Sequence, residues 1–250
     1  GVGPPDRHVG DQQRRALGGD AEILAVRAAL AVTEGGEEVD RLHHAALRLL
    51  YGYEHLAAGR GDLRRAAAAG IKDFGENYFQ EALEKIEGLS DLALSWHFIG
   101  PIQSNKTRGI AEHFDWVQSV DREKIARRLS DQRTNTRPPL NVCVQVNLSA
   151  ETSKSGLDLQ SAASLCASIA QLPNLSLRGL MAIPAPLSDL QAQREGFRRL
   201  ATEHQKLQQH YPSMDTLSMG MSNDYEAAIA EGSTLIRIGA ALFGLRSTSV

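Results

Sequence analysis

The sequence contains only two cysteines, and no lysine occurs before residue 72. Cys143 and Cys166 are too few for a disulfide framework or a cysteine metal site. No apolar run approaches the roughly 18 residues that a membrane-spanning helix needs. The beginning of the chain also lacks the charged and apolar segments of a secretory signal. These absences favour a cytoplasmic protein that holds no metal and contacts no membrane.

An excess of positive charge is also missing, because the formal net charge is −3. Nucleic-acid binding depends largely on a basic surface, so this balance argues against a nucleic-acid partner. The chain has 250 residues, of which 42% are hydrophobic. That is enough for a substantial core in one large domain or two small ones.

From residue 62 onward, predicted strands and helices alternate regularly along the chain. Strands are expected at residues 71–75, 95–100, 116–120, 141–149, 177–184, 216–222 and 234–244. Each is followed by a helix or a helix start, and Asp62 and Asp121 are the expected N-caps of two helices. Alternation of this kind predicts parallel strands joined by right-handed crossovers.

Two architectures fit seven alternating strands, and the choice depends on the first 61 residues. A doubly wound sheet usually carries a glycine-rich GxGxxG turn after an early strand, and this sequence has none. A (β/α)8 barrel of the TIM type needs one more strand, for which residues 21–26 (AEILAV) are a candidate. We therefore expect an α/β fold with a single barrel at residues 62–250, an atypical first strand, and a divergent segment at residues 1–61.

Polar residues at the C-terminal ends of the predicted strands are the candidates for a ligand site, because barrel sites form there. Ser218 and Ser222 end one strand, and Arg237 and Gly239 end the next. The loops after the last two strands of a barrel often bind phosphate. The alternative is that Gly239 only relieves crowding and Ser222 only caps a helix. Arg237 lies in an apolar strand, and a buried arginine must find an acceptor, so we expect a ligand or a carboxylate as its partner.

Three further residues have a structural reading beside a functional one. His97 lies between Trp96 and Phe98, and a single strand histidine is more often a satisfied core residue than a ligand. Asn77 is either a pocket residue or the N-cap of the following helix. Lys154 lies in a loop after a strand, where a solvated lysine is the default.

Several long segments resemble one known family. They are FGENYFQEALEK, WHFIGPIQSNKTR, SKSG, RGLMAIP and TLSMGMSNDYEAAIAEGSTLIRIGAALFG, spread over residues 62–246. These motifs are similar to those of the pyridoxal phosphate homeostasis proteins. The resemblance implies a barrel like that of the alanine racemase N-terminal domain, with pyridoxal 5′-phosphate (PLP) as cofactor. It also implies a monomeric, non-catalytic protein that holds PLP and hands it to PLP-dependent enzymes, so no catalytic residue is expected.

The same resemblance implies roles for residues already singled out. Arg237 would face the pyridine nitrogen of PLP, where a cation disfavours protonation and weakens the ring as an electron sink. Asn77 and Met181 would line the ring pocket, with Ser218 in the same wall. The phosphate would be held by Ser222, Gly239 and Ala240.

Two departures from the family pattern concern cofactor binding directly. The family usually has threonine where this chain has Ala240. A lost hydrogen bond to a charged group costs about 1.5–3 kcal/mol, or roughly ten- to a hundred-fold in affinity. The family also places a PLP-linking lysine on the first strand, where this chain reads HLAAGRGDLRR. Arg60 cannot replace it, because an arginine stays protonated. Lys154 is the candidate substitute amine.

The segment before Asp62 has ten Gly, ten Ala and seven Arg, but neither Phe nor Trp. An out-of-frame or mispredicted 5′ region would have this composition, and a divergent member that binds PLP without a covalent link is the alternative. Two other functions stay open. One is a PLP-dependent amino-acid racemase, which needs a second domain that we do not find in the sequence. The other is a barrel that binds a different phosphorylated metabolite.

Overall fold

The computed structural model describes residues 48–52, 60–149, 155–185, 187 and 189–238, and these form a closed barrel of eight parallel strands. The strands are β1 (Arg48–Gly52), β2 (Asp73–Glu76), β3 (Ser95–Phe98), β4 (Trp116–Val120), β5 (Leu140–Val146), β6 (Leu175–Ala182), β7 (Thr216–Met221) and β8 (Leu235–Ile238). They follow one another around the barrel in chain order, and β1 pairs with β8 to close it. The predicted α/β barrel is therefore confirmed.

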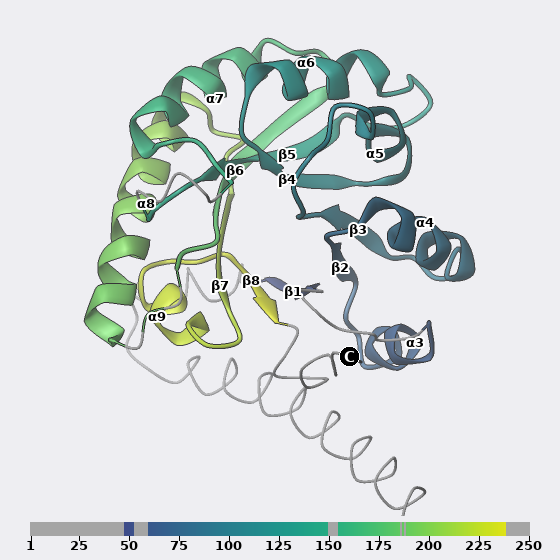
Figure 1. The fold of residues 1–250 in the computed structure, drawn as a ribbon, viewed down its shortest axis with the longest axis horizontal. Coiled ribbons are helices and arrows are strands. Elements are labelled where there is room, and N and C mark those ends of the chain that lie inside the picture. The colour runs from purple at the N-terminus through teal and green to yellow at the C-terminus, as the bar shows by residue number, and fades with distance from the viewer. Residues whose placement is uncertain (1–47, 53–59, 150–154, 186, 188, 239–250) are drawn as a thin grey trace, which may run out of the picture.

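Helices surround this sheet, as Figure 1 shows. They are α3 (Arg60–Ala68), α4 (Phe79–Gly88), α5 (Thr107–His113), α6 (Glu123–Gln132), α7 (Ala162–Ala170), α8 (Leu190–His210) and α9 (Tyr225–Ala230), with a short 3-10 helix η2 (Leu159–Ser161) before α7. Each helix lies between two consecutive strands, which is the crossover that parallel pairing requires. None of the helices in the described part of the chain is long and apolar enough to cross a membrane.

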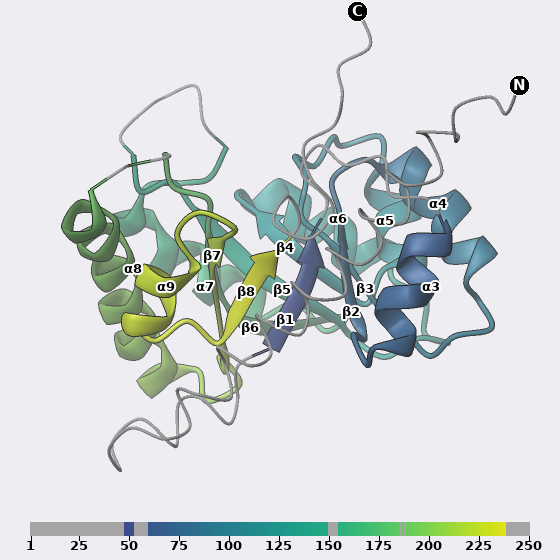
Figure 2. The same cartoon turned by 90° about the horizontal axis from the view of Figure 1, so that it is seen from below.

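The eighth strand lies inside the segment that the sequence set apart. β1 is the short run RLLYG at residues 48–52, and Figure 2 shows it beside β8. Its backbone register joins both neighbours, because Leu50 is opposite Arg237 of β8 and opposite Asp73 of β2. Residues 21–26, the candidate first strand, lie outside the described residues.

Two expected helix caps, Asp62 and Asp121, are wrong, and so is the alternative reading of Asn77 as a cap. α3 begins at Arg60, so Asp62 lies in its first turn, where its carboxylate is 2.6 Å from Arg65. The N-cap of α6 is Arg122 instead of Asp121. The N-cap of α4 is Tyr78, so Asn77 is not a capping residue. In each case the apolar periodicity located the helix but left its first turn uncertain.

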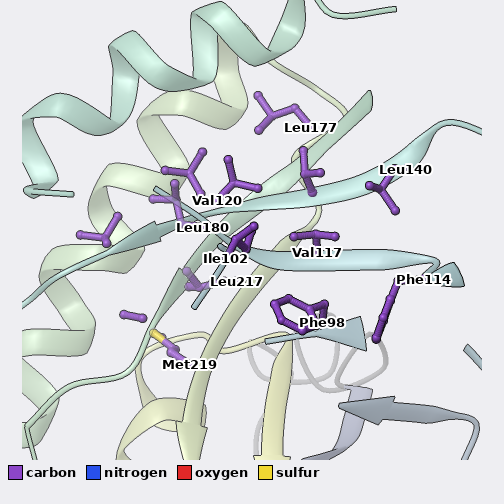
Figure 3. Close-up of a cluster of buried hydrophobic side chains, with 14 of the residues drawn as sticks. Phe98, Ile102, Phe114, Val117, Val120, Leu140, Leu177, Leu180, Leu217 and Met219 are labelled. Carbon is purple, nitrogen blue, oxygen red and sulfur yellow. The ribbon is translucent and has the colours of Figure 1, made fainter. Parts of the chain in front are cut away.

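The main core fills the layer between the sheet and the helices. Figure 3 shows part of it. Phe98 comes from β3, Val117 from β4, Leu180 from β6 and Leu217 from β7. All four residues are at most 3% exposed. Burial of such a side chain contributes about 1.5–3 kcal/mol, so this layer supplies most of the apolar stabilisation. The inside of the barrel is left for a second, more polar set of residues.

Candidate functional site

The candidate site includes Arg237, near the C-terminal end of β8. Arg237 is only 4% exposed. Its Nη1 donates to the Ser218 hydroxyl at 2.7 Å, and its Nη2 donates to the Ala182 carbonyl at 2.8 Å. Ser218 lies within β7, and Ala182 is the last residue of β6. Two acceptors of this buried arginine are thus a hydroxyl and a backbone carbonyl, whereas the sequence predicted a ligand or a carboxylate. The two bonds fix the plane of the guanidinium.

The contact to Ser218 is the first link of a hydrogen-bond chain that crosses the barrel interior. Ser218 Oγ donates to Gln118 Oε1 of β4 at 2.6 Å. Gln118 Nε2 lies 2.8 Å from His97 Nδ1 of β3, and His97 Nε2 lies 2.9 Å from Asp73 Oδ1 of β2. Five strands therefore contribute one side chain each. Ser218, Gln118 and His97 are fully buried.

His97 is a satisfied core residue, as its sequence context indicated. Its ring stacks on Trp116, with centroids 5.2 Å apart and planes within 7°. The Arg178 guanidinium lies 4.8 Å from the centroid of the Trp116 ring. Arg178 is itself held by the carboxylate of Asp215 and by Asn141 Oδ1 at 2.8 Å. A stack of guanidinium, indole and imidazole thus fixes the His97 ring plane.

Ser222 follows β7 directly, and the register places it beside the end of β8, because Met221 is opposite Arg237. Ser222 lines a shallow depression of about 220 Å3 with Leu190 of α8 and the start of α9. In the same loop, Asp224 accepts from the Met221 backbone N–H at 2.6 Å. Burial raises the pKa of Asp224, while this hydrogen bond and the charge of Arg237 act in the opposite direction. The loop after β7 therefore lies within the electrostatic field of Arg237.

Met181 lies inside the barrel, opposite Ser218 in the β6–β7 register. It is fully buried and packs with Trp116 and Cys143. Met181, Ser218 and Arg237 are thus brought together by three neighbouring strands. Met181, Trp116 and Cys143 form an apolar part of the interior beside the hydrogen-bond chain.

Asn77 lies at the same end of the barrel, in the loop after β2, two strands away from Arg237 around the sheet. Its backbone packs closely on the next loop, since a Cβ added at Gly100 would be 2.1 Å from the Asn77 carbonyl oxygen. The preceding residue, Glu76, is 2% exposed and pairs with Lys85 of α4 at 2.7 Å. Burial raises the pKa of Glu76 to about 6, with Lys85 opposing it. The position of Asn77 thus depends on tight backbone packing.

Three predicted residues lie outside the described residues, namely Lys154, Gly239 and Ala240. Sequence reasoning missed two others, Gln118 and Asp73, that the structure connects to Arg237. Gln118 had a signal, because a glutamine inside the short strand WVQSV lies among apolar or small residues. Asp73 had none, because the start of a strand is often solvated.

The chemistry of the described donors fits a PLP ring. A guanidinium offers only donors, and the pyridine nitrogen of PLP is an acceptor. The orientation of Arg237 is fixed by Ser218 and Ala182. Within the described residues, no group of three or more His, Cys, Asp or Glu side chains could hold a metal ion.

Comparison with known proteins gives the class first. Residues 52–247 match the family described as alanine racemase, N-terminal domain. The fold also resembles alanine racemase from Corynebacterium glutamicum, with a TM-score of 0.61 at 15% identity, covering 84% of this chain and 60% of that one. At this identity the likeness concerns the fold alone, and it defines a barrel of the alanine racemase type.

Closer relatives define the family within that class. The pyridoxal phosphate homeostasis protein of Pseudomonas aeruginosa is 61% identical over 184 residues, which are 74% of this chain and 79% of the relative. That of Escherichia coli K12 is 54% identical over 190 residues, 75% of this chain and 81% of the relative. The chain therefore belongs to the pyridoxal phosphate homeostasis protein family. PipY of Synechococcus elongatus, solved with PLP bound, has a TM-score of 0.70 at 36% identity, covering 80% of this chain and 93% of PipY.

Proposed function

We propose that this chain binds PLP at the C-terminal edge of its barrel and acts as a non-catalytic PLP carrier in vitamin B6 homeostasis. The observation that carries the proposal is the buried Arg237 guanidinium, oriented by Ser218 and Ala182 at this edge. The family membership supports it, as does the PLP bound in the related PipY.

Arg237 suits carriage better than catalysis. A fixed cation beside the ring nitrogen disfavours protonation of that nitrogen. An unprotonated ring withdraws electrons weakly, and electron withdrawal is the chemistry that PLP supplies to enzymes. In this proposal Arg237 holds the ring in place and keeps it a poor electron sink. Asn77, Met181 and Ser218 belong to the wall of the ring pocket.

The phosphate end would use the backbone N–H groups of Gly239 and Ala240 together with the Ser222 hydroxyl. The register supports the part of Ser222, because the preceding residue Met221 is opposite Arg237. Ala240 offers no hydroxyl where the family usually has threonine. We expect binding to be weaker than in threonine-bearing relatives by roughly ten- to a hundred-fold.

No lysine precedes residue 72, and β1 reads RLLYG. We therefore propose that PLP is held without a covalent bond to the first strand, with Lys154 as the candidate if an amine is used. The carrier would act as a monomer in the cytoplasm and deliver PLP to PLP-dependent enzymes. Its family membership supports this role.

A titration of the purified chain with PLP, followed by calorimetry, tests the proposal. We expect saturable binding at one site per chain, weakened at least tenfold by R237Q and strengthened about tenfold by A240T. The variant S130A, which alters a buried serine on α6 away from this edge, is expected to match the wild type. Absence of saturable binding would refute the proposal, as would tighter binding of a sugar phosphate than of PLP.

Borohydride reduction of the complex, followed by mass spectrometry, tests the mode of binding. We expect no PLP-lysine adduct in the wild type. An adduct on Lys154 that disappears in K154A would identify the substitute amine instead. Incubation with L-alanine and PLP is expected to yield no D-alanine above the uncatalysed level, and formation at an enzymatic rate would establish a racemase.

A further inference from the structure

The hydrogen-bond chain from Arg237 to Asp73 has a single direction, which its two charged ends impose. A guanidinium has donors only, and a carboxylate has acceptors only. Arg237 Nη1 donates to Ser218 Oγ, so the Ser218 hydroxyl is left to donate to Gln118 Oε1. At the other end, Asp73 Oδ1 accepts from His97 Nε2. Each intermediate group therefore accepts on one side and donates on the other.

This direction fixes the protonation state of His97. With its proton on Nε2, the neutral imidazole accepts at Nδ1 from Gln118 Nε2, 2.8 Å away. A proton on Nδ1 would instead face the Gln118 amide group, and the unprotonated Nε2 would face the Asp73 carboxylate. Reversing the Gln118 amide would restore one contact, but it would direct two donors at Ser218 and leave the serine proton without Gln118 Oε1. Asp73 thus selects the tautomer, and the tautomer selects the amide orientation.

The side chains of this hydrogen-bond chain also have little freedom to rearrange. The His97 ring stacks on Trp116, and the Arg178 guanidinium lies over the same indole ring. Ser95 Oγ adds a contact of 3.2 Å to His97 Nε2. His97, Gln118 and Ser218 are fully buried, so bulk solvent does not compete for these hydrogen bonds. Aligned hydrogen bonds also polarise one another in a low-dielectric interior.

We propose that Gln118, His97 and Asp73 are positioning residues that hold the Arg237 guanidinium toward the ring nitrogen of PLP. This inference rests on the proposed PLP-binding function and extends it to residues on β2, β3 and β4. None of the three would touch the cofactor. They act through Ser218, by keeping its hydroxyl oxygen available to accept from Arg237 Nη1.

The first experiment needs no ligand, and it tests the donor-to-acceptor direction of the hydrogen-bond chain. The 15N shifts of the imidazole nitrogens are measured in protein labelled at its eight histidines, and His97 is assigned by the signal missing in H97Q. We expect His97 to be neutral and protonated on Nε2 at pH 7.5. In D73L this preference should be lost. An Nδ1-protonated or doubly protonated His97 in the wild type would overturn the inference, whether or not PLP binds.

The second experiment tests whether the hydrogen-bond chain affects the contact between Arg237 and the ring nitrogen of PLP. Affinities are compared for PLP and for its 1-deaza analogue, which has carbon in place of that nitrogen. Q118M keeps the length of the side chain but removes its hydrogen bonds. We expect Q118M to weaken PLP binding about tenfold, the loss of one charge-assisted hydrogen bond, and to leave the analogue within twofold of wild type. S130A should change neither ligand.

The outcomes separate the two proposals. If the wild type binds neither ligand, the proposed function fails and the positioning role falls with it. If the wild type binds PLP but Q118M binds it equally well, only the positioning role is refuted. A Q118M variant that loses the same factor for both ligands has a general structural defect, which also contradicts the inference.

Discussion

Glu76 offers a prediction about stability and pH at the edge of the candidate site. It is the last residue of β2 and directly precedes Asn77. Its carboxylate is 2% exposed and lies 2.7 Å from Lys85 Nζ. Burial raises its pKa to about 6 from an ordinary value of 4.5, even though Lys85 lowers it. Desolvation therefore outweighs the ion pair.

A raised pKa means that the folded protein binds the Glu76 proton more tightly than the unfolded chain does. The contribution to stability is complete below pH 4.5 and is lost as the pH rises through about 6. The difference between these two pKa values corresponds to about 2 kcal/mol. The glutamine of E76Q stays neutral and does not titrate. The free energy of unfolding of the wild type should therefore fall by about 2 kcal/mol relative to that of E76Q between pH 4.5 and pH 7.

Urea unfolding of both proteins across this pH range measures the effect, because titration of all other groups cancels in the difference. E84Q removes a carboxylate from the exposed face of α4 and controls for the change in net charge. A difference between wild type and E76Q that stays constant with pH, or that grows in favour of the wild type, would refute the argument that desolvation dominates at Glu76.

Three other substitutions test close packing. G100A would place a Cβ 2.1 Å from the Asn77 carbonyl oxygen, so calorimetry should show weaker PLP binding through displacement of that loop, and unchanged binding would contradict it. G179A would place a Cβ 1.6 Å from the Thr216 carbonyl oxygen between β6 and β7. It should cost about 3 kcal/mol in urea unfolding, and a loss below about 1 kcal/mol would show that the strands separate easily. Buried Arg133 donates to three backbone carbonyls, two near the end of α5 and one just before β5. R133L should also cost about 3 kcal/mol, whereas a stable R133L would mean that water satisfies these carbonyls.

Much of the fold could be predicted because each βα unit leaves its own local pattern. The run NVCVQVNLS predicts a buried strand by its β-branched residues, and the periodic apolar positions of residues 190–210 predict α8. β1 had no comparable signal, since RLLYG is five residues long and lies in a Gly-, Ala- and Arg-rich segment. Its assignment depends on pairing with β2, about 20 residues later, and with β8, at the far end of the sequence.

The candidate site could be predicted at its edge but not in its interior. Ser222 and Arg237 follow from their places at strand ends, whereas Ser218, also expected at a strand end, lies within β7 and is fully buried. The link between Ser218 and Gln118 joins residues 100 positions apart, and it exists only because the barrel closes. No local pattern records such a contact, so a polar residue in a buried strand was the available signal.

Closure of the barrel and orientation of Arg237 are connected through β1. Asp73 and Arg237, the two ends of the hydrogen-bond chain, are both in register with Leu50. The interior chain thus crosses the barrel on one side, and the backbone of β1 joins its ends on the other. If β8 slipped by one residue against β1 while β1 kept its register with β2, Arg237 would shift relative to Asp73 by one strand position, about 3.3 Å. That exceeds the tolerance of hydrogen bonds with lengths of 2.6–2.9 Å. The hydrogen-bond chain therefore favours one offset between β8 and β2, the two neighbours of a strand whose own sequence specifies its register weakly.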